Sequence, residues 1–362
     1  MIYRILFSAF VLIVIAFSCK KSVSGIDGVF LESEPYILDY GNTLAAPNLP
    51  ADNPLTKAKV QLGRMLFYEK SLSGDNSMSC ASCHNQANAF SDINQFSIGI
   101  DGLPGGRQAM AIVNMAWNSN GFFWDGRAAT LREQSLKPIQ DVLEMHETLP
   151  NVVVKLSAKT IYKDQFKRAF GTEEITSEKM SLAMEAFMFT LVSGNSKYDR
   201  FLAGLASLTP SEEHGRQLFF AEYNPGFPNL SGADCAHCHS GSNFENDQYM
   251  NNGLDIDANM LDDGYMNVTL NASDKAKFKV PTLRNIEVTF PYMHDGRLTT
   301  LEEVVDHYNT GIQSSSTVDP AILNTQFSGL MLNAQDKIDL VNFLKTLTDH
   351  SFLTDQRFSS PF

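Results

Sequence analysis

The sequence predicts an all-α fold of two similar helical domains, and three observations support this prediction. The clearest periodic stretches carry apolar residues at helical spacing, and most of the chain lacks the alternation of half-buried strands. The motif C-x-x-C-H occurs twice, at residues 80–84 and 235–239. Segments around the first motif recur in the same order around the second. With 362 residues, 43% of them apolar, the chain is long enough for two separate cores.

The N-terminus indicates export. Arg4 precedes an apolar run over residues 5–17, which is too short to span a bilayer comfortably and is typical of a secretory signal. The segment ending in Cys19 resembles a bacterial lipobox, so we expect residues 1–18 to be a lipoprotein signal peptide and Cys19 to carry a membrane lipid anchor. Phe17 is bulkier than that motif usually has, which leaves a soluble cleaved form and an uncleaved anchor as alternatives. All three interpretations place the body outside the cytoplasm, in the periplasm.

The first domain is expected over residues 52–205, after a tether over residues 19–51 that lacks periodicity and is rich in Gly, Pro and Asn. A helix over residues 59–67 is predicted to lead into the first C-x-x-C-H motif. An amphipathic helix over residues 178–192 is predicted to close the domain. The apolar face of that helix carries Met184, Phe187, Met188 and Leu191.

The second domain is expected over residues 206–362, with a boundary near residues 204–209. Its first helix has a defined start, because Thr209 can cap it, a Pro follows at the first helical position and Glu212 completes a capping box. Another amphipathic helix is predicted over residues 336–347. Its apolar face is expected to carry Ile338, Val341, Leu344 and Leu347.

Charge and cysteine content narrow the function classes. The formal net charge of −13, from 28 basic and 41 acidic residues, argues against a nucleic-acid partner, because phosphate neutralisation needs clustered Lys and Arg. One of the five Cys residues is Cys19, and the other four belong to the two C-x-x-C-H motifs. None therefore remains for a disulfide. The repeated order of helices and C-x-x-C-H motifs supports neither a dinucleotide-binding protein nor a zinc protein.

The spacing of each motif is that of a covalently attached c-type haem. Two thiols separated by two residues form thioethers to the two vinyl groups of one haem, and the adjacent His becomes the proximal iron ligand. A single motif would also fit half of a zinc site or a redox pair, but two copies in an exported chain favour two haems. The two domains are therefore expected to be cytochrome c-like. The attachment residues are Cys80, Cys83 and His84 for one haem, and Cys235, Cys238 and His239 for the other.

Further motifs carry a family resemblance. The segment FWDGR at residues 123–127 is echoed by MHDGR at 293–297, alongside KPIQ at 137–140 and FKVPTLRN at 278–285. From about residue 55 to residue 347 the chain resembles bacterial di-haem cytochrome c peroxidases and the related MauG proteins. This resemblance implies that the N-terminal haem binds hydrogen peroxide and that the C-terminal haem receives electrons from an external donor.

The distal side of the first haem departs from the family pattern. Many members carry a displaceable His ligand in a Ser-x-Gly-His loop, but Ile100 stands at that position here. No further His follows until His146. The resemblance therefore implies an open distal site that accepts peroxide without prior reduction. Met110 and Met115 stay open as alternative ligands.

Two residues match the family's distal pocket. Glu144 matches an acid–base carboxylate, and heterolysis of peroxide needs a group that moves a proton from the bound oxygen to the leaving oxygen. Gln134 matches a polar neighbour of that carboxylate. The alternative for Glu144 is that it caps or solvates a helix, as most Glu residues do.

Trp124 matches the tryptophan that lies between the two haems in the family. An aromatic residue there supports electron transfer between sites that are too distant for direct contact. The alternative role is that of a large core residue. The other tryptophan, Trp117, lacks the matching context.

The far-side ligand of the second haem distinguishes the subfamilies. Peroxidases of this type have a Met in the helix after the second Asp-Gly segment, whereas LEEVVDHY at residues 301–308 places Tyr308 there, as in MauG proteins. An axial Met raises the reduction potential of a haem, and an anionic oxygen ligand lowers it. The competing ligands are Met293 and His307, followed by Met250, Met260 and Met266.

The resemblance also implies a calcium ion between the domains. In the family this ion is held by backbone carbonyls and an Asn side chain. Thr289 and Pro291 match the carbonyl donors, and Gln108 replaces the Asn. Because Gln keeps a carbonyl oxygen, which is a suitable hard ligand, we expect one calcium ion.

These expectations define a primary hypothesis and two alternatives. The primary hypothesis is a peroxidase that reduces hydrogen peroxide to water with electrons from a small cytochrome c or cupredoxin. The second is a MauG-like enzyme that oxidises a protein or organic substrate, which Tyr308 and the missing distal His favour. The third is a non-enzymatic electron-transfer cytochrome. Dimers are common in the family, so a homodimer stays open.

Overall fold

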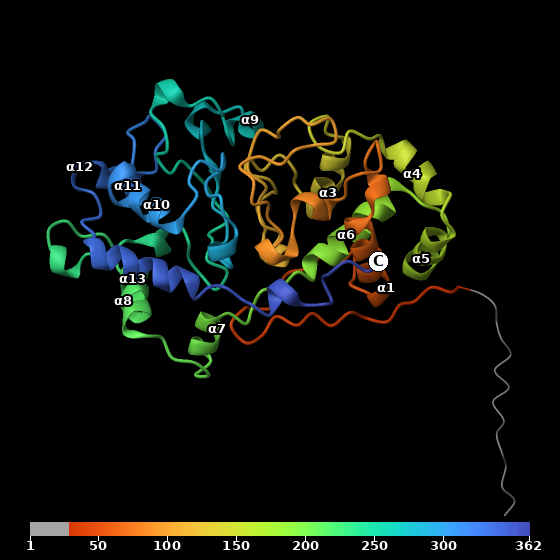
Figure 1. The fold of residues 1–362 in the computed structure, drawn as a ribbon, viewed down its shortest axis with the longest axis horizontal. Helices are drawn as coiled ribbons and strands as arrows, with labels where there is room; N and C mark the ends of the chain where they lie inside the picture. The colour runs from red at the N-terminus through yellow and green to blue at the C-terminus, as the bar shows by residue number, and fades with distance from the viewer. Residues whose placement is uncertain (1–28) are drawn as a thin grey trace, which may run out of the picture.

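The computed structural model describes residues 29–362 as two helical lobes side by side (Figure 1). The predicted signal peptide and the predicted lipid anchor at Cys19 lie outside the described residues. Among residues 29–362, no helix is long and apolar enough to cross a membrane. The only sheet in this part of the chain is an antiparallel pair, β1 (Tyr249–Met250) with β2 (Phe278–Lys279). The all-α fold with two cytochrome c-like domains is confirmed.

The helices divide between the lobes in sequence order. The first lobe contains α1 (Lys57–Tyr68), α2 (Cys80–Cys83), α3 (Leu131–Gln140), α4 (Leu149–Ser157), α5 (Thr160–Phe170) and α6 (Ser177–Phe189). After α7 (Lys197–Leu202), the second lobe contains α8 (Pro210–Phe220), α9 (Met266–Thr269), α10 (Leu301–Asp306), α11 (Pro320–Leu323), α12 (Thr325–Ser328) and α13 (Ala334–Lys345). Long connections with short 3₁₀ turns join them.

Each lobe is built around the crossing of its first and last long helices. Gly63 of α1 lies against the Ala183 carbonyl of α6, and Gly215 of α8 lies against the Asp339 carbonyl of α13. A Cβ at either glycine would stand 1.9 Å from that carbonyl oxygen, so a larger residue would separate the helices. The duplication seen in the sequence is therefore also a duplication of packing.

The predicted helix ends agree closely with the structure, but one predicted core residue was wrong. Thr209 and Glu212 form the expected capping box at the start of α8. Ile338 of α13 is 53% exposed, whereas Leu340 and Phe343 are buried. The buried face of α13 is set by positions 340, 343, 344 and 347, which have the i, i+3, i+4, i+7 spacing of a packed helix.

The two hydrophobic cores do not follow the predicted boundary at residue 205. Tyr198 of α7 packs into the core of the second lobe. The last residues return to the first lobe, where Phe352 and Phe358 join its core. In Figure 1 the C-terminus lies beside α1. The chain therefore crosses between the lobes more than once.

The described part of the predicted tether lies along the body instead of standing away from it (Figure 1, red). The backbone N–H of Tyr36 donates to the Leu55 carbonyl at 3.1 Å. The Thr43 hydroxyl donates to Asp199 at 2.7 Å, and the Trp117 indole donates to the Ala45 carbonyl at 2.8 Å. These contacts make residues 29–51 a strap across both lobes.

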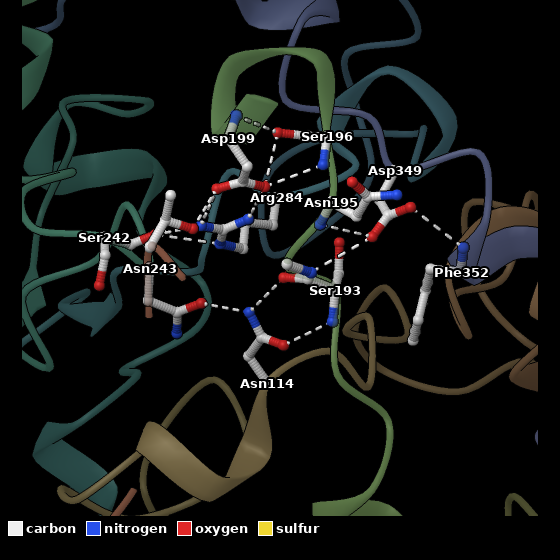
Figure 2. Close-up of polar contacts among 12 residues, drawn as sticks. Asn114, Ser193, Asn195, Ser196, Asp199, Ser242, Asn243, Arg284, Asp349 and Phe352 are labelled. Atoms are coloured by element: carbon white, nitrogen blue, oxygen red, sulfur yellow. Dashed lines mark hydrogen bonds and ion pairs between the residues drawn. The ribbon is translucent and has the colours of Figure 1, made fainter. Parts of the chain in front are cut away.

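A buried polar network joins the strap, the two lobes and the C-terminal tail (Figure 2). Arg284 donates to both carboxylate oxygens of Asp199, at 2.8 and 2.9 Å, and both side chains are almost fully buried. Asn114 of the first lobe donates to the Asn243 side chain of the second at 2.9 Å. Because each buried polar group has a partner, the network fixes how the lobes meet.

We expect Asp199→Asn to destabilise the protein by about 3–5 kcal/mol, because the substitution leaves the buried guanidinium of Arg284 without a counter-charge. The measurement is the midpoint of urea unfolding. Asp52→Asn is the control, since Asp52 is 68% exposed where it pairs with Arg132 and an exposed ion pair contributes little to stability. Equal midpoints for the two variants would contradict the prediction.

Candidate functional site

One continuous cavity of about 700 Å³ runs through both lobes, and both C-x-x-C-H motifs line it. The structure therefore brings the predicted attachment residues to one cavity in two groups. The first group is Cys80, Cys83 and His84, and the second is Cys235, Cys238 and His239. All four of these thiols are free in the described chain.

Both histidines are oriented for metal binding. The Nδ1 atom of His84 lies 2.7 Å from the Phe90 carbonyl oxygen, and Nδ1 of His239 lies 3.1 Å from the Phe244 carbonyl oxygen. A ring that donates through Nδ1 presents the lone pair of Nε2 to a metal. Burial lowers the pKa of His239 to about 4 and also lowers the pKa of His84, which keeps both rings neutral. These residues fit two covalently attached haems.

The two predicted acid–base residues, Gln134 and Glu144, both line the cavity. Gln134 and Pro138 lie one turn apart on the face of α3 that lines the cavity, and Glu144 follows in the turn after this helix. The Glu144 backbone N–H donates to the Asp141 carbonyl at 3.1 Å, and its carbonyl accepts from Ile100 at 2.9 Å. The backbone of Glu144 is therefore held on both sides.

The pKa of the Glu144 carboxyl is raised toward neutral pH. Burial raises its pKa to about 7, with a further contribution from the Asp141 charge and an opposing one from Arg127. Glu144 lines the same cavity as Cys80 and Cys83 of the first motif. A group with a pKa close to the working pH is the most effective general acid–base.

A second, more open pocket of about 340 Å³ adjoins the cavity beside α3. The Arg127 guanidinium lies 3.6 Å from the centre of the Phe123 ring at this place. The residues that line both the pocket and the cavity are Phe123, Arg127, Pro138, Asp141 and Glu144. Glu144 therefore stands where a small molecule from solvent would reach the first haem.

The loop after the first motif brings no imidazole into the cavity among the described residues. Ile98 and Gly99 line the cavity, and the Ile100 backbone is held by Glu144. His146 is exposed, and its Nδ1 lies 2.6 Å from a carboxylate oxygen of Asp101. Met110 and Met115 both line the cavity, so they stay open as distal ligands.

Trp124 lies where the lobes meet. Its ring packs against Met260 and Phe278 of the second lobe. The indole N–H donates to the Gln108 carbonyl at 2.8 Å, and the Trp124 carbonyl accepts from the Lys279 backbone N–H at 2.8 Å. Trp124 lines the cavity at this place.

The second half of the cavity contains two of the favoured candidate ligands, Tyr308 and Met293, together with Met250. The His307 ring instead bonds through Nε2 to the Asn252 carbonyl at 2.9 Å. A π-helical turn from His307 to Gly311 begins one residue before Tyr308, and such turns often re-aim a functional side chain. Burial raises the pKa of Tyr308 to about 12.

The three predicted calcium-binding residues, Gln108, Thr289 and Pro291, line this same cavity. Gln108 is buried, and its amide nitrogen donates to the Ser91 hydroxyl at 3.0 Å and to the Asp92 carbonyl at 3.1 Å. Calcium would take only oxygen atoms from such a set.

Sequence reasoning missed one residue of the cavity, Glu245. Burial raises its pKa to about 7, and the Asn243 side chain donates to it at 2.6 Å. It lines the cavity from the second lobe. No motif in the sequence singles it out, because its burial depends on how the two lobes meet.

Comparisons with known proteins identify similar chains. A sequence profile described as "Di-haem cytochrome c peroxidase" matches residues 57–207. The methylamine utilization protein MauG of Methylorubrum extorquens is 36% identical over 300 residues, which covers 82% of this chain and 80% of that protein. The cytochrome c551 peroxidase of Nitrosomonas europaea is 35% identical over 306 residues, which covers 83% of each.

Two solved structures are similar to this chain over most of its length. A MauG-like protein associated with microbial copper homeostasis has a TM-score of 0.81 and 34% identity, and the match covers 90% of this chain and 99% of that one. The diheme peroxidase BthA of Burkholderia thailandensis is similar in fold, with a TM-score of 0.71 at 22% identity, covering 92% of this chain and 98% of that one.

Proposed function

The chain belongs to the di-haem cytochrome c peroxidase and MauG family, and we propose that it reduces hydrogen peroxide to water with electrons from a small cytochrome c or cupredoxin. The family carries two c-type haems, and the two C-x-x-C-H motifs fit that content. One observation carries the proposal. The partly buried carboxyl of Glu144, whose pKa is raised to about 7, lines both the open pocket and the cavity that contains Cys80, Cys83 and His84.

The residues around the first C-x-x-C-H motif have separate roles in peroxide cleavage. Cys80, Cys83 and His84 would hold a haem, which would supply iron for electron exchange with peroxide. Glu144 would accept a proton from one peroxide oxygen and return it to the other, which would leave as water. Gln134, one turn before Pro138 on α3, offers a hydrogen bond to the same oxygens.

We expect Trp124→Phe to slow electron transfer between the lobes by roughly tenfold, equivalent to about 1.4 kcal/mol in the barrier, because Phe is harder to oxidise than Trp. The measurement is the spectral response of the second haem after rapid mixing with peroxide. Trp117→Phe is the matched control and should leave the rate unchanged. Equal slowing by the two substitutions would remove Trp124 from the transfer route.

Steady-state kinetics test the proposed function. The full-length protein with both haems is mixed with hydrogen peroxide and a reduced small cytochrome c, and oxidation of the donor is followed. Sustained turnover supports the peroxidase. Absence of turnover with fully loaded protein would overturn it, and slow turnover with a persistent oxidised protein would favour the second candidate.

The second candidate function is MauG-like oxidation of a protein or organic substrate. Tyr308, in the cavity beside the second pair of cysteines, is the observation that favours it. A plain electron-transfer cytochrome is distinguished by electron paramagnetic resonance of the oxidised protein. That function requires two low-spin irons, whereas an enzyme with an open first site gives one high-spin and one low-spin signal.

Three further assignments belong to this proposal. Calcium would bind at Gln108, Thr289 and Pro291, whose oxygen donors suit it. A lipid at Cys19 would hold the protein at a membrane facing the periplasm. A homodimer stays an option that the family suggests.

A further inference from the structure

A pair of tyrosines lies directly beside the segment that carries Trp124. The rings of Tyr249 and Tyr265 are stacked with centroids 3.9 Å apart and planes 7° apart. Most aromatic pairs in proteins have centroids about 4.5–7 Å apart, so these two rings are unusually close. Neither ring lines the cavity or the open pocket beside α3, and neither residue belongs to a C-x-x-C-H motif.

Tyr249 reaches the Trp124 segment in two ways. Its ring packs on Gly126, where a Cβ would lie only 2.3 Å from the Tyr249 hydroxyl oxygen. In the β1–β2 pair Tyr249 stands opposite Lys279, whose backbone N–H donates to the Trp124 carbonyl. The Tyr249 hydroxyl also donates to the Asn120 carbonyl at 2.5 Å. Packing and hydrogen bonds thus connect the Trp124 segment to Tyr249.

A nearby positive charge makes the Tyr249 ring harder to oxidise than the Tyr265 ring. The Lys279 ammonium lies 5.4 Å from the centre of the Tyr249 ring, and the Lys279 side chain is only 5% exposed. A buried cation near a ring opposes the loss of an electron from that ring. Asp247 pairs with Lys279 at 2.9 Å and offsets part of this effect. After one-electron oxidation of the stack, the radical therefore resides mainly on Tyr265, because the Lys279 ammonium lies near the Tyr249 ring.

Tyr265 is partly exposed at the start of α9, which Figure 1 shows at the top of the molecule where the lobes meet. Apolar side chains near it in the chain face solvent, with Leu270 86% and Val268 43% exposed. An aromatic ring beside exposed apolar side chains suits contact with another small aromatic molecule.

We propose that the Tyr249–Tyr265 stack is a surface oxidation site for small phenols, which passes their electrons to Trp124. The inference rests on the proposed function, because peroxide is the oxidant. Tyr265 gives one electron through Tyr249 toward Trp124 and its phenolic proton to water, which leaves a neutral tyrosyl radical. A phenol then gives a hydrogen atom to Tyr265 and leaves as a phenoxyl radical. Two such cycles supply the two electrons and two protons that convert one peroxide into two waters.

Radical trapping tests the site directly. The ferric full-length protein with both haems is mixed with one equivalent of hydrogen peroxide and a nitroso spin trap, without a donor, and the labelled peptide is identified by mass spectrometry. We expect the label on Tyr265 and its loss in Tyr265→Phe. Tyr36→Phe, in the strap against Leu55, makes the same chemical change elsewhere and should keep the label.

Kinetics with guaiacol provide a second measurement. Peroxide-dependent guaiacol oxidation should fall at least about tenfold in Tyr265→Phe, while peroxide reduction with a reduced small cytochrome c stays within about twofold. A label elsewhere in the wild-type protein, or unchanged guaiacol oxidation in the variant, would overturn the tyrosine site and leave the peroxidase proposal intact. Haem spectra that do not respond to peroxide at all would overturn both proposals.

Discussion

Glu144→Gln is expected to lower kcat/KM for peroxide reduction by roughly 10²–10⁴-fold, the usual contribution of a positioned acid–base group. The amide keeps the size of the carboxyl but cannot accept the proton of the bound peroxide. Steady-state turnover with a reduced small cytochrome c measures the loss. Both haem spectra should be unchanged, because Glu144 is not among the residues that attach or ligate iron.

Glu133→Gln provides the matched control for this substitution. Glu133 lies on α3 as well, but it is exposed and its carboxylate pairs with Lys137. We expect turnover of this variant to stay within about twofold of the wild type, as for most surface changes. Wild-type turnover in Glu144→Gln would remove the acid–base role and leave a structural one.

The raised pKa of Glu144 also predicts a pH profile. Burial favours the neutral carboxyl, so at pH values below about 7 most of the molecules carry a protonated Glu144 that cannot accept a proton. Activity should therefore rise with pH through about 7 and level off above it. The rise should be absent in Glu144→Gln, and its persistence there would assign the titration to another group.

Tyr308→Met is expected to raise the reduction potential of the second haem by a large part of the roughly 0.8 V that axial ligands span. A thioether stabilises ferrous iron, whereas an anionic phenolate stabilises the ferric state. A spectroelectrochemical titration that resolves both haems measures the shift. The first haem should keep its potential.

Met293→Leu separates the two candidate ligands. Both side chains line the second half of the cavity, and the Met293 sulfur lies 3.1 Å from the Asn252 side-chain nitrogen. If Tyr308 ligates iron, Met293→Leu leaves the potential and spectrum of the second haem nearly unchanged. A large shift in this variant, together with none in Tyr308→Met, would identify Met293 as the ligand.

The parts of the fold that follow local rules were predictable from the sequence. The C-x-x-C-H spacing is fixed by the geometry of thioether attachment, and the start of α8 is fixed by the cap at Thr209. The buried face of α13 was less predictable, because it depends on where α8 packs. Ile338 fits an apolar periodicity and still faces solvent.

The candidate site was predictable only where the family resemblance reached it. Glu144 and Trp124 follow from recognised segments, and the structure places both in contact with the cavity. Glu245 and the Tyr249–Tyr265 stack depend on tertiary packing, which no local pattern specifies. The π-helical turn beside Tyr308 lies in an ordinary helical sequence, so its extra residue per turn could not be foreseen.

Because segments are exchanged between the lobes, neither half of the sequence contains all the residues of one lobe. A cut after residue 205 would take Phe352 and Phe358 away from the core of the first lobe. It would also take Tyr198 away from the core of the second. Fragments made at the sequence repeat should therefore fold poorly alone and regain stability when mixed. The two repeats therefore fold as a single cooperative unit. The distance between the two redox centres is set by the packing of the whole chain.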